Sequence, residues 1–203
     1  MEKLRLGVLG SGKGSNYRAI QEAILRGEVN AETVVVISDV QAAGILEAAR
    51  GYGVSARYVA PGRFKTKLEP GAEERVTRLL KEAGVDLVVL AGYMRMVKEP
   101  LLGAFAGCIV NIHPSLLPAF PGLEAWKQAL AAGVAETGCT VHYVDRGMDT
   151  GPVIAQRKVP VLPGDTPDTL HARIQAAEHE VYPEVVRRIA ARLPLYPMDT
   201  SKG

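Results

Sequence analysis

Residues 4–90 alternate between short apolar runs rich in β-branched residues and longer amphipathic stretches. The apolar runs hold few polar residues, which is typical of strands in a sheet covered by helices on both faces. A strand, helix, strand order of this kind builds a parallel sheet. We therefore predict an α/β, Rossmann-like fold with a mostly parallel twisted sheet. The expected strands are Leu4–Leu9, Thr33–Ile37, Val54–Val59 and Asp86–Leu90; the expected helices are Ser15–Arg26, Ala42–Arg50 and Ala72–Ala83; Gly62–Pro70 is an irregular basic loop.

The second half of the chain has a less regular pattern that prolines interrupt. A strand at Cys108–Ile112 runs directly into His113-Pro114, and Pro118 and Pro121 follow closely. Because proline fixes φ and lacks an amide hydrogen, we predict a rigid loop after this strand. The remaining expected elements are a helix at Leu123–Ala132, strands at Thr140–Val144 and Val153–Val159, a long helix from about Pro167 to Arg192, and a frayed C-terminal tail.

The charge and cysteine patterns exclude several classes of protein. The net charge is only +2, and basic residues are interspersed with acidic ones, so nothing indicates nucleic acid binding. The N-terminal apolar run is too short for a signal peptide or a membrane span. Cys108 and Cys139 lie in apolar runs and lack the spacing of a zinc site. We therefore expect two buried reduced thiols, no metal, no membrane association and a cytoplasmic location.

A glycine-rich turn joins the first expected strand to the first expected helix, at residues 10–16. Its glycines allow close approach of a ligand, and the amides at the helix start favour an anion such as phosphate. A Walker A motif fails because Gly14 stands where Ser or Thr must hold magnesium. The dinucleotide pattern fails because its third glycine is replaced by Ser15 or Tyr17. The turn therefore indicates a monophosphate site, with a plain turn that binds nothing as the alternative.

Polar residues end the strand at Cys108–Ile112, at the sheet edge where ligands bind in open parallel sheets. Asn111 and His113 flank Ile112, so on an extended strand their side chains share a face. An amide and an imidazole can both donate to a developing oxyanion, and histidine can also move a proton. Asp149 lies in a later turn and would favour the imidazolium if it approached His113. The alternative is ordinary turn chemistry at both places.

Four segments together resemble the glycinamide ribonucleotide formyltransferase family, in chain order and over nearly the whole length. The longest segment is highly specific to folate-dependent formyltransferases, and the glycine-rich turn points to the member that acts in purine biosynthesis. The resemblance implies a formyltransferase fold and one domain over residues 1–203, with a phosphate-binding half at 1–100 and a folate and catalytic half at 101–203. The segments are Gly12-Lys13-Gly14-Ser15-Asn16, Ala91-Gly92-Tyr93-Met94-Arg95, Asn111-Ile112-His113-Pro114-Ser115-Leu116-Leu117-Pro118 and Met148-Asp149-Thr150-Gly151-Pro152.

The resemblance also implies two small-molecule substrates. Gly14, Ser15 and Asn16 would hold the phosphate of glycinamide ribonucleotide, and Gln175 and Glu178 would contact its sugar or glycinamide end. The cosubstrate would be 10-formyltetrahydrofolate, acting without a metal. A basic residue of the 63–67 loop would stand where the family has an arginine near the folate. The residues implied in folate binding are Lys67, Met94, Arg95, Met96, Val97 and Asn111.

The resemblance assigns the chemistry to three residues. Asn111 and His113 would stabilise the tetrahedral intermediate as the glycinamide amine attacks the formyl carbon. Asp149 would favour the charged form of His113 and help to move protons, with water as a possible carrier. Thr140 and His142 match a Thr-x-His segment near the site.

Two other functions remain as alternatives, and a third is disfavoured. Methionyl-tRNA formyltransferase is disfavoured because it shares the catalytic residues but is expected to carry an additional RNA-binding domain and to lack this phosphate loop. A formyltetrahydrofolate hydrolase would share the folate pocket, and a non-catalytic phosphosugar-binding module would need only the glycine-rich turn. Glu124 stands where relatives often have a histidine, which leaves any auxiliary role of that histidine unfilled. The expected assembly is a monomer or a homodimer.

Overall fold

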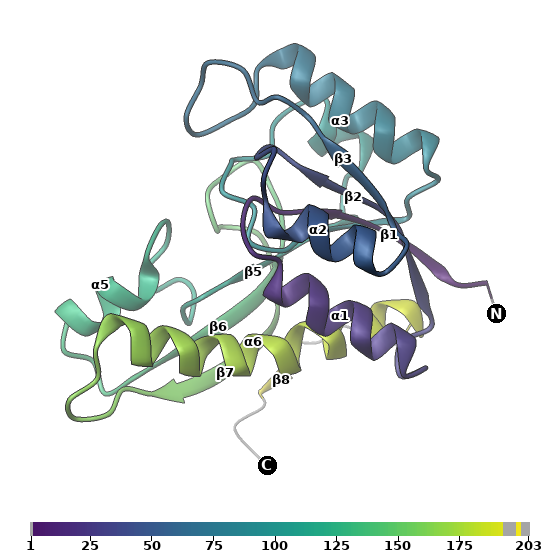
Figure 1. Ribbon diagram of the computed structural model, residues 1–203. Coiled ribbons are helices and arrows are strands. Elements are labelled where there is room, and N and C mark those ends of the chain that lie inside the picture. Colours follow the sequence, from purple (N-terminus) through teal and green to yellow (C-terminus); the bar gives the residue numbers. More distant parts are fainter. Residues whose placement is uncertain (1, 193–197, 200–203) are drawn as a thin grey trace.

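The computed structural model describes residues 2–192 and 198–199 (Figure 1). The described residues contain eight strands, which form one sheet in the order β3-β2-β1-β4-β5-β6-β7-β8. The strands are β1 Leu4–Leu9, β2 Ala31–Ser38, β3 Ser55–Tyr58, β4 Leu87–Leu90, β5 Ile109–His113, β6 Glu136–Tyr143, β7 Val153–Pro160 and β8 Met198–Asp199.

The sheet is mostly parallel, as the sequence predicts. All neighbours from β3 through β5 pair in parallel, because a helix crosses over between successive strands. The direction changes at β5, which pairs antiparallel with β6, and β6 pairs antiparallel with β7. Strand order reverses between β1 and β4, so the crevice beyond the carboxyl ends of these two strands is the expected place for a ligand.

Helices cover both faces of the sheet (Figure 1). One buried apolar cluster joins α1, α2 and α6 to the sheet, and a second joins α3 and α4 to the opposite face. None of the helices in the described part of the chain is long and apolar enough to span a membrane. The helices are α1 Ser15–Leu25, α2 Gly44–Gly51, α3 Pro70–Glu82, α4 Leu101–Ala104, α5 Ala125–Ala131 and α6 Pro167–Ala190.

The structure corrects four details of the sequence-based prediction. The short helix α4 is not foreseen, and β6 begins at Glu136 rather than at Thr140. The expected helix at Leu123–Ala132 starts only at Ala125, because Glu124 has a left-handed backbone with φ 54°. The tail is not simply frayed, since β8 pairs with β7, although residues 193–197 and 200–203 lie outside the described part.

The two cysteines differ in burial. Cys139 is buried within β6, as predicted, whereas Cys108 is exposed and precedes β5. The prediction of a buried Cys108 is wrong because the strand begins one residue later, at Ile109, after a turn at Gly107. Apolar neighbours in sequence do not by themselves place a residue inside the core.

A buried tyrosine on α6 joins the ends of two central strands. The Tyr182 hydroxyl is fully buried and donates to the carbonyl oxygens of Leu90 and Val110, at 2.9 and 3.1 Å. These carbonyls lie at the end of β4 and next to Asn111 in β5. Tyr182 therefore helps to set the spacing of the two strands just before they reach the candidate site.

We expect Tyr182→Phe to lower the free energy of unfolding by about 1–2 kcal/mol, because two buried carbonyls lose their hydroxyl donor. Urea unfolding monitored by circular dichroism measures this change. Tyr52→Phe is the matched control, since its hydroxyl contacts Glu22 at the surface, 3.2 Å away. The control should lose less than about 0.5 kcal/mol. Equal losses in the two variants would contradict the role of Tyr182.

Candidate active site

The end of β5 places Asn111 and His113 on the same side of the strand. Ile112 between them packs into the core cluster of α1, α2 and α6, so the two polar side chains face the other way. The antiparallel register sets Asn111 opposite His142 and His113 opposite Thr140 on β6. Four polar residues from two neighbouring strands thus form one compact group.

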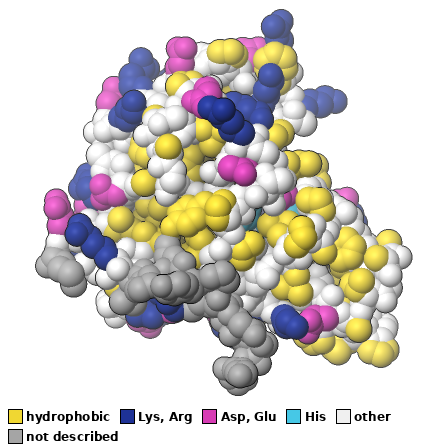
Figure 2. Space-filling model, turned by 180° about the vertical axis from the view of Figure 1, so that it is seen from behind, with side chains coloured by type: hydrophobic (Ala, Val, Ile, Leu, Met, Phe, Trp, Pro, Cys, Tyr) yellow, Lys and Arg dark blue, Asp and Glu magenta, His cyan; other side chains and the backbone are white. Residues whose placement is uncertain are grey.

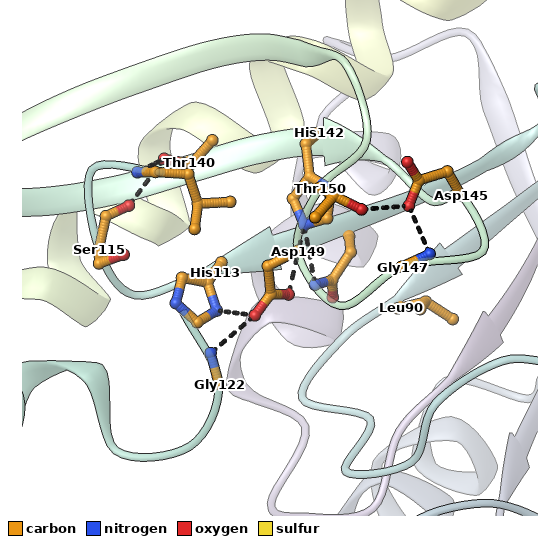
Figure 3. A network of polar contacts seen from close by, with 12 residues as sticks. Leu90, His113, Ser115, Gly122, Thr140, His142, Asp145, Gly147, Asp149 and Thr150 are labelled. Carbon is orange, nitrogen blue, oxygen red and sulfur yellow. Dashed lines mark hydrogen bonds and ion pairs between the residues drawn. The ribbon is translucent and has the colours of Figure 1, made fainter. Parts of the chain in front are cut away.

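The Asp149 carboxylate closes this group from the turn before β7 (Figure 3). One oxygen, Oδ2, lies 3.4 Å from His113 Nδ1 and accepts a 2.9 Å hydrogen bond from the Gly122 amide. The other oxygen, Oδ1, lies 3.8 Å from His142 Nε2. The backbone of Asp149 is left-handed, with φ 56°, and this turn directs the carboxylate back towards β5.

The two histidines differ in the partners that their ring nitrogens meet. His113 faces only oxygen acceptors, with the Phe120 carbonyl 2.9 Å from Nε2 and Asp149 beside Nδ1. A ring nitrogen that carries a proton can donate to the oxygen beside it at either position. His142 Nδ1 instead meets the Tyr143 carbonyl at 2.8 Å, and its Nε2 meets Asn111 Nδ2 at 3.2 Å. Burial lowers the pKa of His142, and its neutral form, with the proton on Nδ1, suits these partners.

The loop after His113 is anchored by Thr140, which is fully buried. Its hydroxyl donates to the Ser115 carbonyl at 2.7 Å and accepts from the Leu117 amide at 3.0 Å. The Gln156 side chain of β7 donates to the Leu117 carbonyl at 2.8 Å. These bonds tie the proline-containing loop to β6 and β7 and keep the Phe120 carbonyl beside His113.

The glycine-rich turn lies against the end of β4. The Ser11 amide donates to the Gly92 carbonyl at 3.0 Å, which places the turn at the crevice between β1 and β4. Gly14 caps α1 with φ 80°, and no side chain caps the helix start. A Cβ at Gly14 would lie 2.8 Å from Ile45, so only glycine fits. The amides of Ser15 and Asn16 begin the helix and can meet an anion.

Helix α6 brings Glu178 to the start of α1. Asn16 Nδ2 donates to Glu178 Oε2 at 2.8 Å, and both residues are buried. Burial raises the pKa of Glu178 to about 7, and the hydrogen bond from Asn16 opposes that rise. The side-chain oxygen of Asn16, Oδ1, is buried without a hydrogen-bond partner among the described residues. Gln175 is half-buried and lies three positions before Glu178, on a neighbouring part of the helix surface.

The segment 94–97 and the loop that carries Lys67 lie side by side. Lys67 and Met96 form a parallel bridge, and the Met96 amide donates to the Thr66 carbonyl at 2.8 Å. The side chains of the segment point in different directions. Met94 is exposed, Val97 is buried in the α3 and α4 core cluster, and the Arg95 guanidinium turns towards Asp39. The backbone, the exposed Met94 and the half-buried Met96 offer a surface to a flat ligand.

Apolar side chains border the candidate site. Met94, Leu123 and Met148 are three of the exposed large apolar residues, and the Met148 methyl lies 3.8 Å from where a Cβ of Gly122 would be. Figure 2 shows hydrophobic side chains gathered across the middle of one face, with a small cyan area of histidine visible among them. An apolar rim around a few polar groups is typical of a small-molecule site.

The structure thus brings the sequence-predicted residues into three groups at one edge of the sheet. Asn111, His113 and Asp149 form the first group, Gly14 to Asn16 with Glu178 the second, and Lys67 with 94–97 the third. Sequence reasoning missed the contacts of His142 and of the Gly122 amide with Asp149. The resemblance places His142 near the site, and the alternation within 140–144 indicates which face of the strand it lies on. The described residues contain no cluster of three side chains suited to a metal ion.

The chain is similar to known proteins over most of its length. The family model for formyl transferases matches residues 4–186. The chain belongs to the formyl transferase family. It is 40% identical over 91% of its length to the phosphoribosylglycinamide formyltransferase of Bacillus subtilis, of which it spans 94%.

Two further members of the family show how the similarity extends. The chain is 46% identical over 92% of its length to the trifunctional purine biosynthetic protein adenosine-3 of Drosophila pseudoobscura pseudoobscura, but spans only 14% of that protein. The crystal structure of glycinamide ribonucleotide transformylase 1 from Symbiobacterium toebii matches with a TM-score of 0.90 and 49% identity. That match covers 94% of this chain and 89% of the other. The predicted formyltransferase fold is therefore confirmed.

We expect the buried Glu178 to make the stability of this formyl transferase depend on pH. Since its pKa is about 7 in the folded state, against an ordinary value of 4.5, the folded protein holds the proton more tightly. Stability is therefore lost as pH rises through this range. Glu178→Gln removes the penalty, so the variant should match the wild type below about pH 4 and exceed it by up to about 3 kcal/mol above about pH 8.

Urea unfolding at several pH values checks this expectation. Glu180→Gln is the matched control, because Glu180 is exposed on the same helix. The control should change stability equally at all pH values. If the stability difference between Glu178→Gln and the wild type does not grow with pH, the pKa of Glu178 is not raised in the folded state.

Proposed function

We propose that the protein transfers the formyl group of 10-formyltetrahydrofolate to the amine of glycinamide ribonucleotide. The products are formylglycinamide ribonucleotide and tetrahydrofolate, in purine biosynthesis. The observation that carries the proposal is the group of Asn111, His113 and Asp149 at the end of β5 in a chain of this family. The names of the relatives support these substrates, since they specify formyl transfer to phosphoribosylglycinamide.

The phosphate of glycinamide ribonucleotide would bind at the start of α1. Gly14, Ser15 and Asn16 would present backbone amides at the positive end of the helix, where no side chain caps it. The unpartnered Asn16 Oδ1 and the adjacent Glu178 would accept hydrogen bonds from the sugar or the glycinamide end, with Gln175 nearby. The substrate would then extend from the face of α1 across the crevice towards Asn111.

The folate would lie along the segment 94–97. The backbone there, the exposed Met94 and Asn111 would meet the pterin ring, and Lys67 would face its acidic portion. Val97 would contribute only its backbone, because its side chain is buried in the core. The fit is that of a flat ring against main chain and an apolar rim. Residues 1–100 and 101–203 would then act as one unit, since both substrates contact both halves.

Formyl transfer needs hydrogen-bond donors that stabilise the negative charge developing on the formyl oxygen. It also needs a group that carries protons. The amine nitrogen attacks the formyl carbon, and the carbonyl electron pair moves to oxygen. Asn111 and His113 would donate to this oxygen. The bond from carbon to N10 of the folate then breaks, N10 gains a proton, and the former amine loses one. Asp149 would compensate the charge of His113 and pass protons, either directly or through water.

The ring nitrogen of His113 that would reach the substrate already has a partner within the protein. Its Nε2 lies 2.9 Å from the Phe120 carbonyl, so the substrate oxygen must replace that acceptor. His142 would remain neutral and hold the Asn111 amide in place through Nε2. The imidazole of His113 would thus both bind the substrate oxygen and stabilise the charge that develops on it.

An assay with 10-formyltetrahydrofolate, with and without glycinamide ribonucleotide, tests the proposal. Folate turnover that requires the amine supports formyl transfer. Turnover without the amine would favour the formyltetrahydrofolate hydrolase, and binding of the phosphosugar without turnover would favour a binding module. The cytoplasmic location, the independence from metal and the monomeric or homodimeric state remain predictions.

We expect His113→Ala to lower kcat by about 10²–10⁴-fold, because the donor acts mainly in the transition state. The dissociation constant for glycinamide ribonucleotide, measured by calorimetry, should change less than about threefold. His171→Ala is the matched control, since His171 stacks on Trp126 at 3.8 Å between α5 and α6. That variant should keep its kcat. Near-normal turnover in His113→Ala would refute the assignment.

A further inference from the structure

An ion pair beneath the 64–67 loop lies outside the group around His113. Arg95 Nε donates to Asp39 Oδ2 at 2.5 Å, and the two side chains are only 14% and 5% exposed. Asp39 directly follows β2, and Arg95 lies beyond the end of β4. The pair therefore links the ends of β2 and β4 at the edge of the sheet where ligands bind. Asp39 and Arg95 are separated by 56 positions along the chain.

Another nitrogen of the Arg95 guanidinium, Nη1, lies inside the 64–67 loop. Arg95 Nη1 donates to the carbonyl oxygens of Phe64 at 2.6 Å, Lys65 at 3.0 Å and Lys67 at 3.3 Å. The loop thus wraps around one cation. A planar guanidinium can direct several donors at once, whereas an ammonium group on a flexible chain cannot hold the same set.

Asp39 is in turn held by the glycine-rich turn. The Ser11 hydroxyl donates to Asp39 Oδ1 at 2.6 Å and accepts from the Met94 amide at 3.0 Å. Both carboxylate oxygens of Asp39 therefore have partners. The chain of contacts runs from the candidate phosphate turn, through Ser11, Asp39 and Arg95, to the loop that carries Lys67.

We propose that Asp39 and Arg95 are positioning residues that hold the 64–67 loop in the shape needed to bind the folate. This inference rests on the proposed function for the identity of the ligand. The sequence prediction placed Arg95 in the wall of the folate pocket, but its Nε and Nη1 are engaged by Asp39 and the loop. Arg95 therefore acts through Lys67 and the bridge of Lys67 to Met96.

Asp39→Asn is the informative change, because it keeps the shape of the side chain and removes the charge that balances Arg95. A guanidinium of low exposure then lacks its counter-ion, and the loop loosens. Arg95→Lys keeps the charge but loses the fork of donors. Asp165→Asn is the matched control, since Asp165 pairs with Arg173 at 2.7 Å in another part of the fold.

Limited trypsin digestion, with cleavage sites mapped by mass spectrometry, reports on the loop without any substrate. The loop contains the exposed cleavage sites Lys65 and Lys67, and the exposed Arg63 directly precedes it. We expect cleavage at these sites to be about tenfold faster in Asp39→Asn and also faster in Arg95→Lys. In Asp165→Asn cleavage there should equal that of the wild type. Unchanged cleavage in both loop variants would overturn the inference.

Steady-state kinetics then separate positioning from general damage. In Asp39→Asn the KM for 10-formyltetrahydrofolate should rise about tenfold, while kcat and the KM for glycinamide ribonucleotide change less than about threefold. A parallel fall in kcat with an unchanged folate KM would overturn the inference. If the wild type shows no formyl transfer at all, the proposed function fails, and the trypsin result still decides whether the pair holds the loop.

Discussion

Antiparallel pairing of β5 with β6 sets Asn111 opposite His142 and His113 opposite Thr140. The strands before β5 are parallel, and their hydrogen bonds are evenly spaced and slanted. At β5 the direction changes, and the facing residues form direct cross-strand pairs. Both histidines lie beside Asp149, His142 also meets Asn111, and Thr140 holds the loop that follows. The chemistry of the site depends on this change of direction.

The glycine-rich turn and the group around His113 lie at the same edge but on different faces of the sheet. The glycine-rich turn and Glu178 belong to the side of α1 and α6, whereas Asn111 and His113 point away from that side. At the crevice between β1 and β4, Ser11 joins the glycine-rich turn to Gly92 and to Asp39. Crevices of this kind hold ligands because strand ends expose backbone groups and neighbouring loops diverge.

Much of the fold could be predicted from local pattern. The expected boundaries of β1 and the start of α1 are those observed, because β-branched runs and amphipathic periods are strong local signals. Burial of Cys108 was predicted wrongly, since one residue separates the strand from a turn. The helix α4 was missed because four residues carry too little periodicity. The pairing of Asp39 with Arg95 had no sequence signal, since the two residues lie far apart along the chain.

The sequence by itself determined the order of the strands and helices other than α4 and β8, the glycine at the start of α1 and the chemistry available at residues 111, 113 and 149. These follow from apolar spacing, from backbone freedom at Gly14 and from side-chain type. Only the tertiary structure decided which nitrogen of His113 meets which oxygen, that His142 joins the group, and that Arg95 turns into the loop. Such contacts depend on register and loop shape, which arise when distant segments pack together.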